Sequence, residues 1–483
     1  MNRHPFPPAP PRKSQYGVDP DQVKRRGAQL EGIVGVPLRE LFPSLPKVIY
    51  PNNHSGEAVI RKATEDALRG VDLSVIKPGS TVNILASHHG FTFLGGKPYA
   101  EMLRTIKDVV ERETGAKEVR LRAGLGMRFR ETEEYIRAHG LDDYFQGRAL
   151  GIAPIDAGIP IETELGTLYG LRRAYDADVI IHAHNSDVRE VHFHRHVDRA
   201  VKPFGMSYAR VETRSTYHQN LGPRAANFVA RAIFESEFVQ SKYGFSVFMV
   251  MSPLGVLTVE ADRDLYRLNE RITISGMRNY GRVITLFGKI DECIVILDFP
   301  CPVPYVFAGG TIYANMVCAN VDIFDLDVPL PPYTWYTEAF HDDRGRPLIP
   351  EIPPVNPAIK MVVHNYAWTG YPATFFAEHI PTIVVGRAQA DLFKRDPMNL
   401  NYMRYALLAE ELDGAVEFAL RTTKTDKIII FDGAVGGINV SRSLAEHLLE
   451  VAPSVEREVE EVLMPKWLYQ RGIDPNAPTG SMW

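Results

Sequence analysis

The sequence has few cysteines, no excess of positive charge and no long hydrophobic run. Its three cysteines, Cys293, Cys301 and Cys318, are too few for a disulfide framework and form no Cys-x-x-Cys pair, as is typical of cytoplasmic proteins. Lys and Arg number 54 against 59 Asp and Glu, a net charge of −5, so no basic field favours nucleic acid or a membrane surface. No apolar run approaches the roughly 18 residues of a membrane span, and the first 17 residues contain no signal-peptide core. We therefore expect a cytoplasmic protein whose partner is a small molecule.

The 483 residues have the composition of an ordinary globular protein, with 45% hydrophobic and 23% charged residues. At roughly 150 residues per domain, this length predicts two to three domains. The N-terminal segment is rich in proline, and we expect a flexible arm that embraces a neighbouring subunit of a homo-oligomer. The predicted organisation is an arm over residues 1–30, an N-terminal α/β catalytic domain over 31–272, a C-terminal α/β domain over 273–470 and a tail over 471–483.

Short β-branched runs alternate with amphipathic segments along the chain. A strand over 81–86, a helix over 98–114 and a strand over 118–123 form a βαβ unit, with Gly115 where a helix C-cap belongs. Such units imply parallel strands with right-handed crossovers. The predicted fold class is therefore α/β, with two domains of mainly parallel sheets and an active-site cleft between them. Further strands are predicted over 178–183, 283–287, 293–298, 359–363, 382–386 and 427–431, and further helices over 131–139, 224–243 and 402–421.

Histidines are concentrated in one part of the sequence. Of 15 in the chain, six fall within 37 residues, about 8% of the length, where random scatter would place roughly one. His182 lies near the end of a predicted strand, and α/β sheets bind ligands at the carboxyl ends of their parallel strands. Neutral imidazole also ligates zinc, nickel, iron and manganese. The window is therefore the candidate active site; its histidines are His182, His184, His192, His194, His196 and His218.

The spacing of residues within this window resembles the nickel-pincer-nucleotide lactate racemases and their relatives. In that family, an Asp-rich lead into a strand is followed by a Glu-x-His-Phe segment, a Lys ten residues after the His, and another His sixteen residues after the Lys. Here Glu190-Val191-His192-Phe193 is followed by Lys202 and His218 at those separations, with Asp176 and Asp178 before the strand. Upstream, ILASHHGFT (84–92) and RAGLGMRFRETEEY (122–135) stand where the family has two further motifs. The resemblance spans roughly residues 45–260.

The resemblance implies a racemase or epimerase that uses a nickel-pincer nucleotide made by separate cofactor-biosynthesis enzymes. Lys202 would attach the nucleotide through a thioamide, and His218 would ligate the nickel. His192 would be the general base that takes the hydroxyl proton of a 2-hydroxy acid while the α-hydrogen leaves as hydride. By the same resemblance, Thr92 and Arg128 would contact the nucleotide, and Arg195 or Arg199 would hold its phosphate in place of glycines that the family has there.

The sequence also departs from the family pattern. The family's second acid/base histidine falls on Gly126, so we expect His88 or His89 to act as the opposing acid/base or as a phosphate contact. The glycine-rich run before the family's lysine is replaced by residues 197–201, so an arginine is expected to hold the phosphate instead. These changes indicate a 2-hydroxy acid other than simple lactate, such as a larger polyhydroxy acid.

Two other functions compete with this interpretation. The first is a metal-dependent hydrolase, in which His182, His184 and the histidines over 192–196 hold zinc or manganese around an activated water. The second is a homologue that binds the cofactor or a metal without catalysis. Elsewhere, the glycine-rich segment 433–437 follows a predicted strand and would begin a helix, as a nucleotide-binding turn does, although the Gly-x-Gly-x-x-Gly spacing is absent.

Overall fold

The computed structural model describes residues 18–51, 56–124, 131–186, 200–215, 226–298, 322, 324–327, 355–367, 374–396 and 401–474. The chain divides into two compact units, and each is built on its own α/β sheet. The first unit comprises residues 47–276, and the second combines residues 1–46 with residues 277–483. The predicted α/β class with mainly parallel sheets is confirmed.

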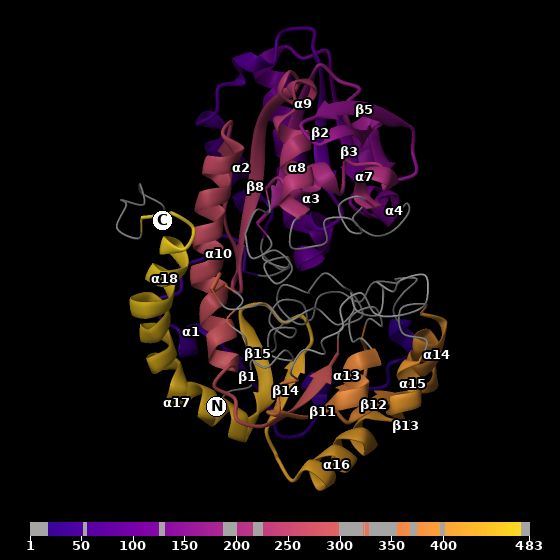
Figure 1. Ribbon diagram of the computed structural model, residues 1–483, viewed down its shortest axis with the longest axis vertical. Coiled ribbons are helices and arrows are strands. Elements are labelled where there is room, and N and C mark those ends of the chain that lie inside the picture. Colours follow the sequence, from indigo (N-terminus) through magenta and orange to yellow (C-terminus); the bar gives the residue numbers. More distant parts are fainter. Residues whose placement is uncertain are drawn as a thin grey trace. The chain divides into compact units, whose positions relative to one another are not determined.

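The first unit, in which Figure 1 labels β2, β3 and β8, contains a six-stranded sheet. The order of its strands is β4-β3-β2-β7-β8-β9. All neighbours are parallel except β8 and β9, which form an antiparallel pair. The chain runs outward from β2 through β3 to β4 and returns to place β7 on the other side of β2. The strand order therefore reverses between β2 and β7. The strands are β2 (Thr81–Ser87), β3 (Glu118–Gly124), β4 (Ala149–Ile152), β7 (Val179–Asn185), β8 (Tyr243–Ser252) and β9 (Gly255–Asp262), with a separate hairpin of β5 (Gly158–Thr163) and β6 (Gly166–Leu171).

The helix that links β2 to β3 shows how local sequence defines an element. Helix α3 (Lys97–Thr114) begins after Gly96, whose φ is +82°, and has Pro98 in its first turn, where a missing N–H costs nothing. It ends at Gly115, whose left-handed conformation suits a residue without a side chain. The other helices of the unit are α2 (Ala58–Arg69), α4 (Glu131–Ala138), α5 (Leu141–Tyr144), α6 (Lys202–Gly205), α7 (Val211–Ser215), α8 (Ala226–Glu235) and α9 (Glu237–Gln240); α10 (Leu265–Phe287) runs through the boundary between the units.

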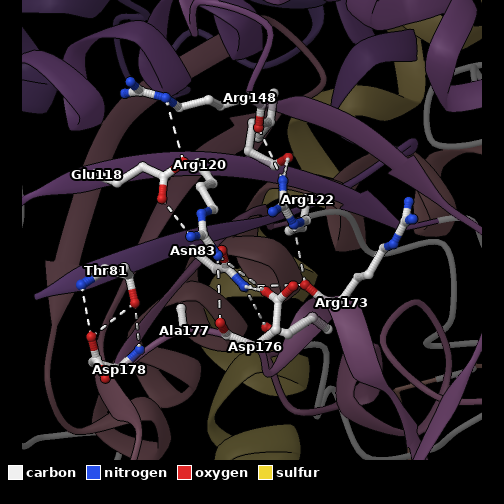
Figure 2. A network of polar contacts seen from close by, with 12 residues as sticks. Thr81, Asn83, Glu118, Arg120, Arg122, Arg148, Arg173, Asp176, Ala177 and Asp178 are labelled. Carbon is white, nitrogen blue, oxygen red and sulfur yellow. Dashed lines mark hydrogen bonds and ion pairs between the residues drawn. The ribbon is translucent and has the colours of Figure 1, made fainter.

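Polar side chains join the amino ends of β2, β3 and β7, as Figure 2 shows. Asp178 accepts hydrogen bonds from the backbone N–H and the hydroxyl of Thr81, both at 2.8 Å. The buried Asn83 donates from Nδ2 to Asp176 at 2.8 Å. The same nitrogen also donates to the backbone carbonyls of Arg173 and Ala174. Arg120 pairs with Glu118 and lies 3.7 Å from Asp176. The aspartates that precede the strand in sequence therefore fix the strands at the edge opposite to the histidines.

The second unit contains a seven-stranded sheet with the order β1-β15-β14-β10-β11-β12-β13. Strands β10 to β14 are parallel, whereas β15 pairs antiparallel with both β14 and β1. The strands are β1 (Ile33–Pro37), β10 (Cys293–Leu297), β11 (Ile359–His364), β12 (Thr382–Val385), β13 (Ala406–Ala409), β14 (Ile428–Phe431) and β15 (Gly437–Ser441). The helices are α1 (Leu38–Leu41), α13 (Thr374–His379), α14 (Arg387–Arg395), α15 (Tyr402–Tyr405), α16 (Leu412–Thr423), α17 (Arg442–Glu458) and α18 (Met464–Tyr469), with a π-helical turn over Val459–Leu463.

Four sequence predictions of secondary structure were wrong in detail. The predicted strand 283–287 lies inside α10, where Met277, Tyr280, Val283 and Phe287 are buried at helical spacing. The segment 402–421 contains strand β13 between two helices. The predicted helix 224–243 is interrupted at Ser236, which is extended and caps α9 with its side chain. The segment 433–437 leads into strand β15 and not into a helix, so it forms no nucleotide-binding turn.

The described part of the chain contains no helix that is both long enough and apolar enough to cross a membrane.

Candidate active site

The carboxyl ends of β2 and β7 lie side by side at the point where the strand order of the first unit reverses. Open α/β sheets bind ligands at such points, because the crossovers on either side leave opposite faces of the sheet and open a crevice between them. Strand β2 ends in Ser87, followed by His88 and His89, and β7 ends in His184 and Asn185. Polar and titratable side chains are therefore concentrated where the topology predicts a binding site.

Four imidazole rings gather at this edge. The ring centroids of His88 and His89 are 3.7 Å apart, those of His89 and His184 are 6.4 Å apart, and those of His184 and His182 are 5.7 Å apart. His88, His182 and His184 are buried, whereas His89 is partly exposed. His182 and His184 lie two residues apart on β7 and so occupy the same face of the sheet. The sequence separation of about 95 residues between the two pairs is closed by the parallel pairing of β2 with β7.

His182 is fixed through both ring nitrogens. Its Nε2 lies 2.9 Å from the carbonyl of Ala200, which can only accept, so the neutral ring donates from Nε2. Its Nδ1 lies 3.0 Å from the hydroxyl of Tyr208, which also lies 3.1 Å from the carbonyl of Leu85 on β2. Burial and the neighbouring His184 lower the pKa of His182 well below its ordinary value. His182 is therefore a neutral ring that ties β7 to β2 and to the segment before Lys202.

Two glycines allow the backbone to pack closely at this edge. A Cβ on Gly124, at the end of β3, would lie 2.2 Å from the carbonyl oxygen of Ser207. A Cβ on Gly90 would lie 2.5 Å from the ring of Tyr99. The Tyr99 hydroxyl donates to the carbonyl of Ala183 at 2.7 Å and accepts from the backbone N–H at the end of β2. The edge is therefore rigid, as a site that positions reacting groups requires.

Lys202 is placed beside the same edge. It is the first residue of α6 and is half-buried. Two residues earlier, Ala200 accepts from His182 and donates its N–H to the side chain of Asn269 at 3.2 Å. The ring of Phe204, on the same short helix, lies 5.2 Å from the ring of His182. The start of α6 is therefore held against β7 by hydrogen bonds on one side and by ring packing on the other.

Asn185, the last residue of β7, is buried without full hydrogen bonding. Its Nδ2 lies 3.0 Å from the Met251 sulfur, a weak acceptor, and its Oδ1 has no hydrogen-bond partner in the described part of the chain. An unsatisfied buried amide oxygen costs roughly 1–3 kcal/mol and therefore points to a missing donor. A half-buried lysine and an unsatisfied amide at one strand edge fit the attachment of a polar cofactor such as a nucleotide.

The structure brings together some of the residues predicted from sequence. His88 and His89 lie at the carboxyl edge described above, and Lys202 begins the short helix whose start is bound to His182 of β7. Thr92 lies in a 3₁₀ segment over Gly90–Gly96 that follows β2. The other predicted site residues lie outside the described residues; they are His192, Arg195, Arg199, Arg128 and His218.

The described residues contain no group of three or more His, Cys, Asp or Glu side chains that could hold a metal ion. The hydrolase interpretation uses His182 as a ligand, but both of its ring nitrogens bond to protein groups. His182 is therefore engaged by protein groups in this structure, and the histidines over 192–196 lie outside the described residues, so the hydrolase interpretation stays a prediction.

Three residues of the edge were not found from the sequence. Tyr208 and Tyr99 form its buried hydrogen bonds, and no motif distinguishes them from other core tyrosines. Asn185 has a clearer signal, because it is the first amide after the predicted strand 178–183. A systematic inspection of polar residues just beyond strand ends would have identified it.

Comparison with known proteins yields distant likenesses in fold. The chain resembles the lactate racemase apoprotein from Thermoanaerobacterium thermosaccharolyticum, with 13% identity, 78% of this chain and 92% of that chain covered, and a TM-score of 0.43. A crystal structure of a protein from Thermotoga maritima has 13% identity, covers 83% and 84% of the two chains, and has a TM-score of 0.35. A scan of family models and a search of curated proteins found no match.

Proposed function

We propose that the protein is an isomerase, a racemase or epimerase of a 2-hydroxy acid other than simple lactate. The observation that carries the proposal is a series of contacts in the first unit: Ala200, two residues before Lys202, accepts from His182, and the ring of His182 neighbours that of His184, which neighbours that of His89. An amine that can carry a cofactor and imidazoles that can exchange protons lie at one rigid edge. The reaction itself is inferred from the sequence spacing of Lys202, His192 and His218.

Lys202 is the proposed attachment point of a nickel-pincer nucleotide. Its backbone is fixed through Ala200, which would limit the freedom of the attached group and favour a single reactive geometry. When bound, this group supplies a pyridinium ring that reversibly accepts a hydride. In this proposal Asn185 contributes an acceptor at the same edge, and His218 serves as the protein ligand of nickel. Arg195, Arg199, Thr92 and Arg128 complete the proposed cofactor contacts.

Two histidine sites would move the hydroxyl proton of the substrate. His192 takes the hydroxyl proton on one face of the substrate. On the other face His88 or His89 exchanges this proton, because the chain has Gly126 where the family has its second histidine. Neutral imidazole suits both directions of transfer because its ordinary pKa is close to physiological pH. The contact between the rings of His88 and His89 allows the partly exposed His89 to connect the buried His88 with solvent.

The reaction is tested with 2-hydroxy acids that carry deuterium at carbon 2, including lactate and larger polyhydroxy acids. The protein is co-expressed with cofactor-making enzymes, and products are analysed by chiral chromatography and mass spectrometry. We expect inversion of a larger acid with deuterium retained, and loss of most activity in His88→Asn or His89→Asn but not in His447→Asn, a histidine of α17 in the other unit.

Two results would contradict the proposal. Exchange of the deuterium with solvent would show proton abstraction at carbon 2. A fully loaded protein that inverts none of the acids would favour the homologue that binds the cofactor without catalysis.

A further inference from the structure

The second unit contains a cavity of about 210 Å³ at the carboxyl ends of β11, β12 and β13. One wall is the turn from β12 into α14, over residues 385–389. A second wall is the turn from β13 into α16, over residues 410–412, and Asn365 follows β11. Residues 22–25 of the N-terminal segment close the remaining side. The cavity therefore lies at the sheet edge where α/β folds bind ligands.

Two helices begin at this cavity. Helix α14 follows Gly386 and α16 follows Glu411, and neither cap residue makes a side-chain hydrogen bond to its helix. Each helix therefore presents first-turn N–H groups and the positive end of its dipole toward the cavity. Gly386 has a φ of +80°, and a Cβ built on it would meet no atom within 4 Å. The backbone there is open to a ligand.

Asn365 places a hydrogen-bond acceptor of fixed orientation at the cavity. Its side chain lines the cavity and the residue is 6% exposed. Its Nδ2 donates to the carbonyl of Arg25 at 2.8 Å and to Asp298 at 2.9 Å, and Oδ1 makes no hydrogen bond in the described chain. Because the two bonds fix the amide, Oδ1 is held in one orientation as an acceptor. Oδ1 is open to the cavity and is therefore available to accept a hydrogen bond from a bound group.

The charges around the cavity leave one cation and one carboxylate available. Lys24 pairs with Glu411 at 2.6 Å, and Arg25 pairs with Asp413. Arg387 is exposed and has no ion-pair partner among the described residues. Glu410 accepts no hydrogen bond there and interacts only electrostatically, with Lys24. The cation lies at the start of α14, so the positive charge of Arg387 and the helix dipole act on the same point.

We propose that this cavity binds a phosphorylated polyol of the ribose phosphate class, either free or as part of a nucleotide. The phosphate lies at the start of α14 beside Arg387, and the hydroxyls donate to Glu410 and to Oδ1 of Asn365. Glu410 directly follows β13, the strand that pairs with β12, and it lies 24 residues after Gly386 (410 − 386). This is the arrangement in which a βαβ unit places phosphate on its helix and ribose hydroxyls on an acidic residue. This cavity belongs to the second unit, whereas Lys202 belongs to the first.

Isothermal titration calorimetry of the full chain with ribose 5-phosphate, AMP and inorganic phosphate tests the proposal. We expect ribose 5-phosphate or AMP to bind more tightly than inorganic phosphate, and the tighter of the two identifies the source of the ligand. Arg387→Ala should weaken all three by about 10- to 100-fold, because it removes a charge-assisted contact. Glu410→Gln should weaken only the two hydroxylated ligands. Arg395→Ala, at the other end of α14, is the matched control and should change none.

The proposal is overturned if neither ribose 5-phosphate nor AMP binds at millimolar concentrations. Equal binding of all three ligands with no effect of Glu410→Gln also overturns it, as does an Arg387→Ala variant that behaves like Arg395→Ala. The exposed side chains of Arg387 and Glu410 can be replaced without disturbing the core, and unchanged thermal unfolding of each variant verifies this. Because the assay needs neither the nickel cofactor nor a 2-hydroxy acid, its outcome does not depend on the proposed isomerase activity.

Discussion

His364→Gln is predicted to make the second unit less sensitive to acid. His364, at the end of β11, is fully buried; its Nε2 lies 2.6 Å from the hydroxyl of Tyr402, and its ring packs edge-on against Phe393. Burial lowers the pKa of His364 from 6.5 to about 3. The folded protein therefore keeps this ring neutral at pH values where the unfolded chain protonates it.

The size of the effect follows from proton linkage. Above pH 6.5 the ring is neutral in both states and the pH has no effect through this group. Below pH 6.5 the unfolded state binds a proton that the folded state does not, so stability falls as the pH falls, down to the folded pKa. At pH 5, the pH is 1.5 units below the pKa of the ring in the unfolded chain. Protonation of the unfolded chain therefore lowers the free energy of unfolding by about 2 kcal/mol. For a unit of this size, that is a shift of about 0.7 M in the urea midpoint.

Tryptophan fluorescence measures the unfolding of this unit separately. All four tryptophans of the chain, at 335, 368, 467 and 483, belong to the second unit. Urea midpoints at pH 7.5 and pH 5 are compared for wild type, His364→Gln and the control His447→Gln, which replaces a partly exposed histidine of α17. Burial raises the pKa of Asp298 to about 6, so this carboxyl group increases the stability of the folded unit as the pH falls, opposite to His364. The change in urea midpoint between the two pH values is therefore compared between His364→Gln and wild type. An equal loss of midpoint in wild type and His364→Gln would refute the reasoning.

Three further predictions concern a pair of glycines, one in each unit, and two residues of the first unit. Gly124→Ala should destabilise the first unit by about 1–3 kcal/mol, because the added methyl group would collide with backbone atoms. Gly414→Ala, in open space within α16, should stabilise the second unit by up to about 1 kcal/mol, because alanine favours the helix. Calorimetric unfolding measures both changes. Tyr208→Phe should cost about 1–3 kcal/mol in the same assay, because it leaves a buried imidazole nitrogen unsatisfied. In the isomerase assay, Lys202→Ala should abolish turnover and His194→Ala should not, and equal losses would contradict the assigned roles.

Much of the fold could be predicted from local sequence. The βαβ unit over residues 81–123 was predicted because its strands are β-branched and its helix begins with Pro98 and ends at Gly115. The strand at 283–287 was mispredicted because a β-branched run within a buried helix looks the same as a strand over five residues. The edge strand β13 was missed because four residues between two amphipathic helices carry no periodicity of their own.

The candidate site was predicted less completely than the fold. The concentration of histidine identified β7, but His182 is the central residue of that strand, and it is His184 that lies near its end. Sequence alone did not show that His182 is fixed by Tyr208 and Ala200, because those contacts depend on how β2, β7 and the start of α6 pack together. Nor did it reveal the unsatisfied Asn185, since an amide is identified as unpaired only once its neighbours are placed.

Lys202 is the proposed point of cofactor attachment, and peptide mass spectrometry tests this assignment directly. The protein is co-expressed with the cofactor-making enzymes, digested and analysed together with its nickel content. We predict a nucleotide adduct on Lys202 with one nickel per adduct, and no nickel in Lys202→Ala. The control Lys242, which donates to a loop carbonyl at the opposite edge of the sheet, should carry no adduct. An unmodified Lys202 despite a full supply of cofactor would contradict the assignment.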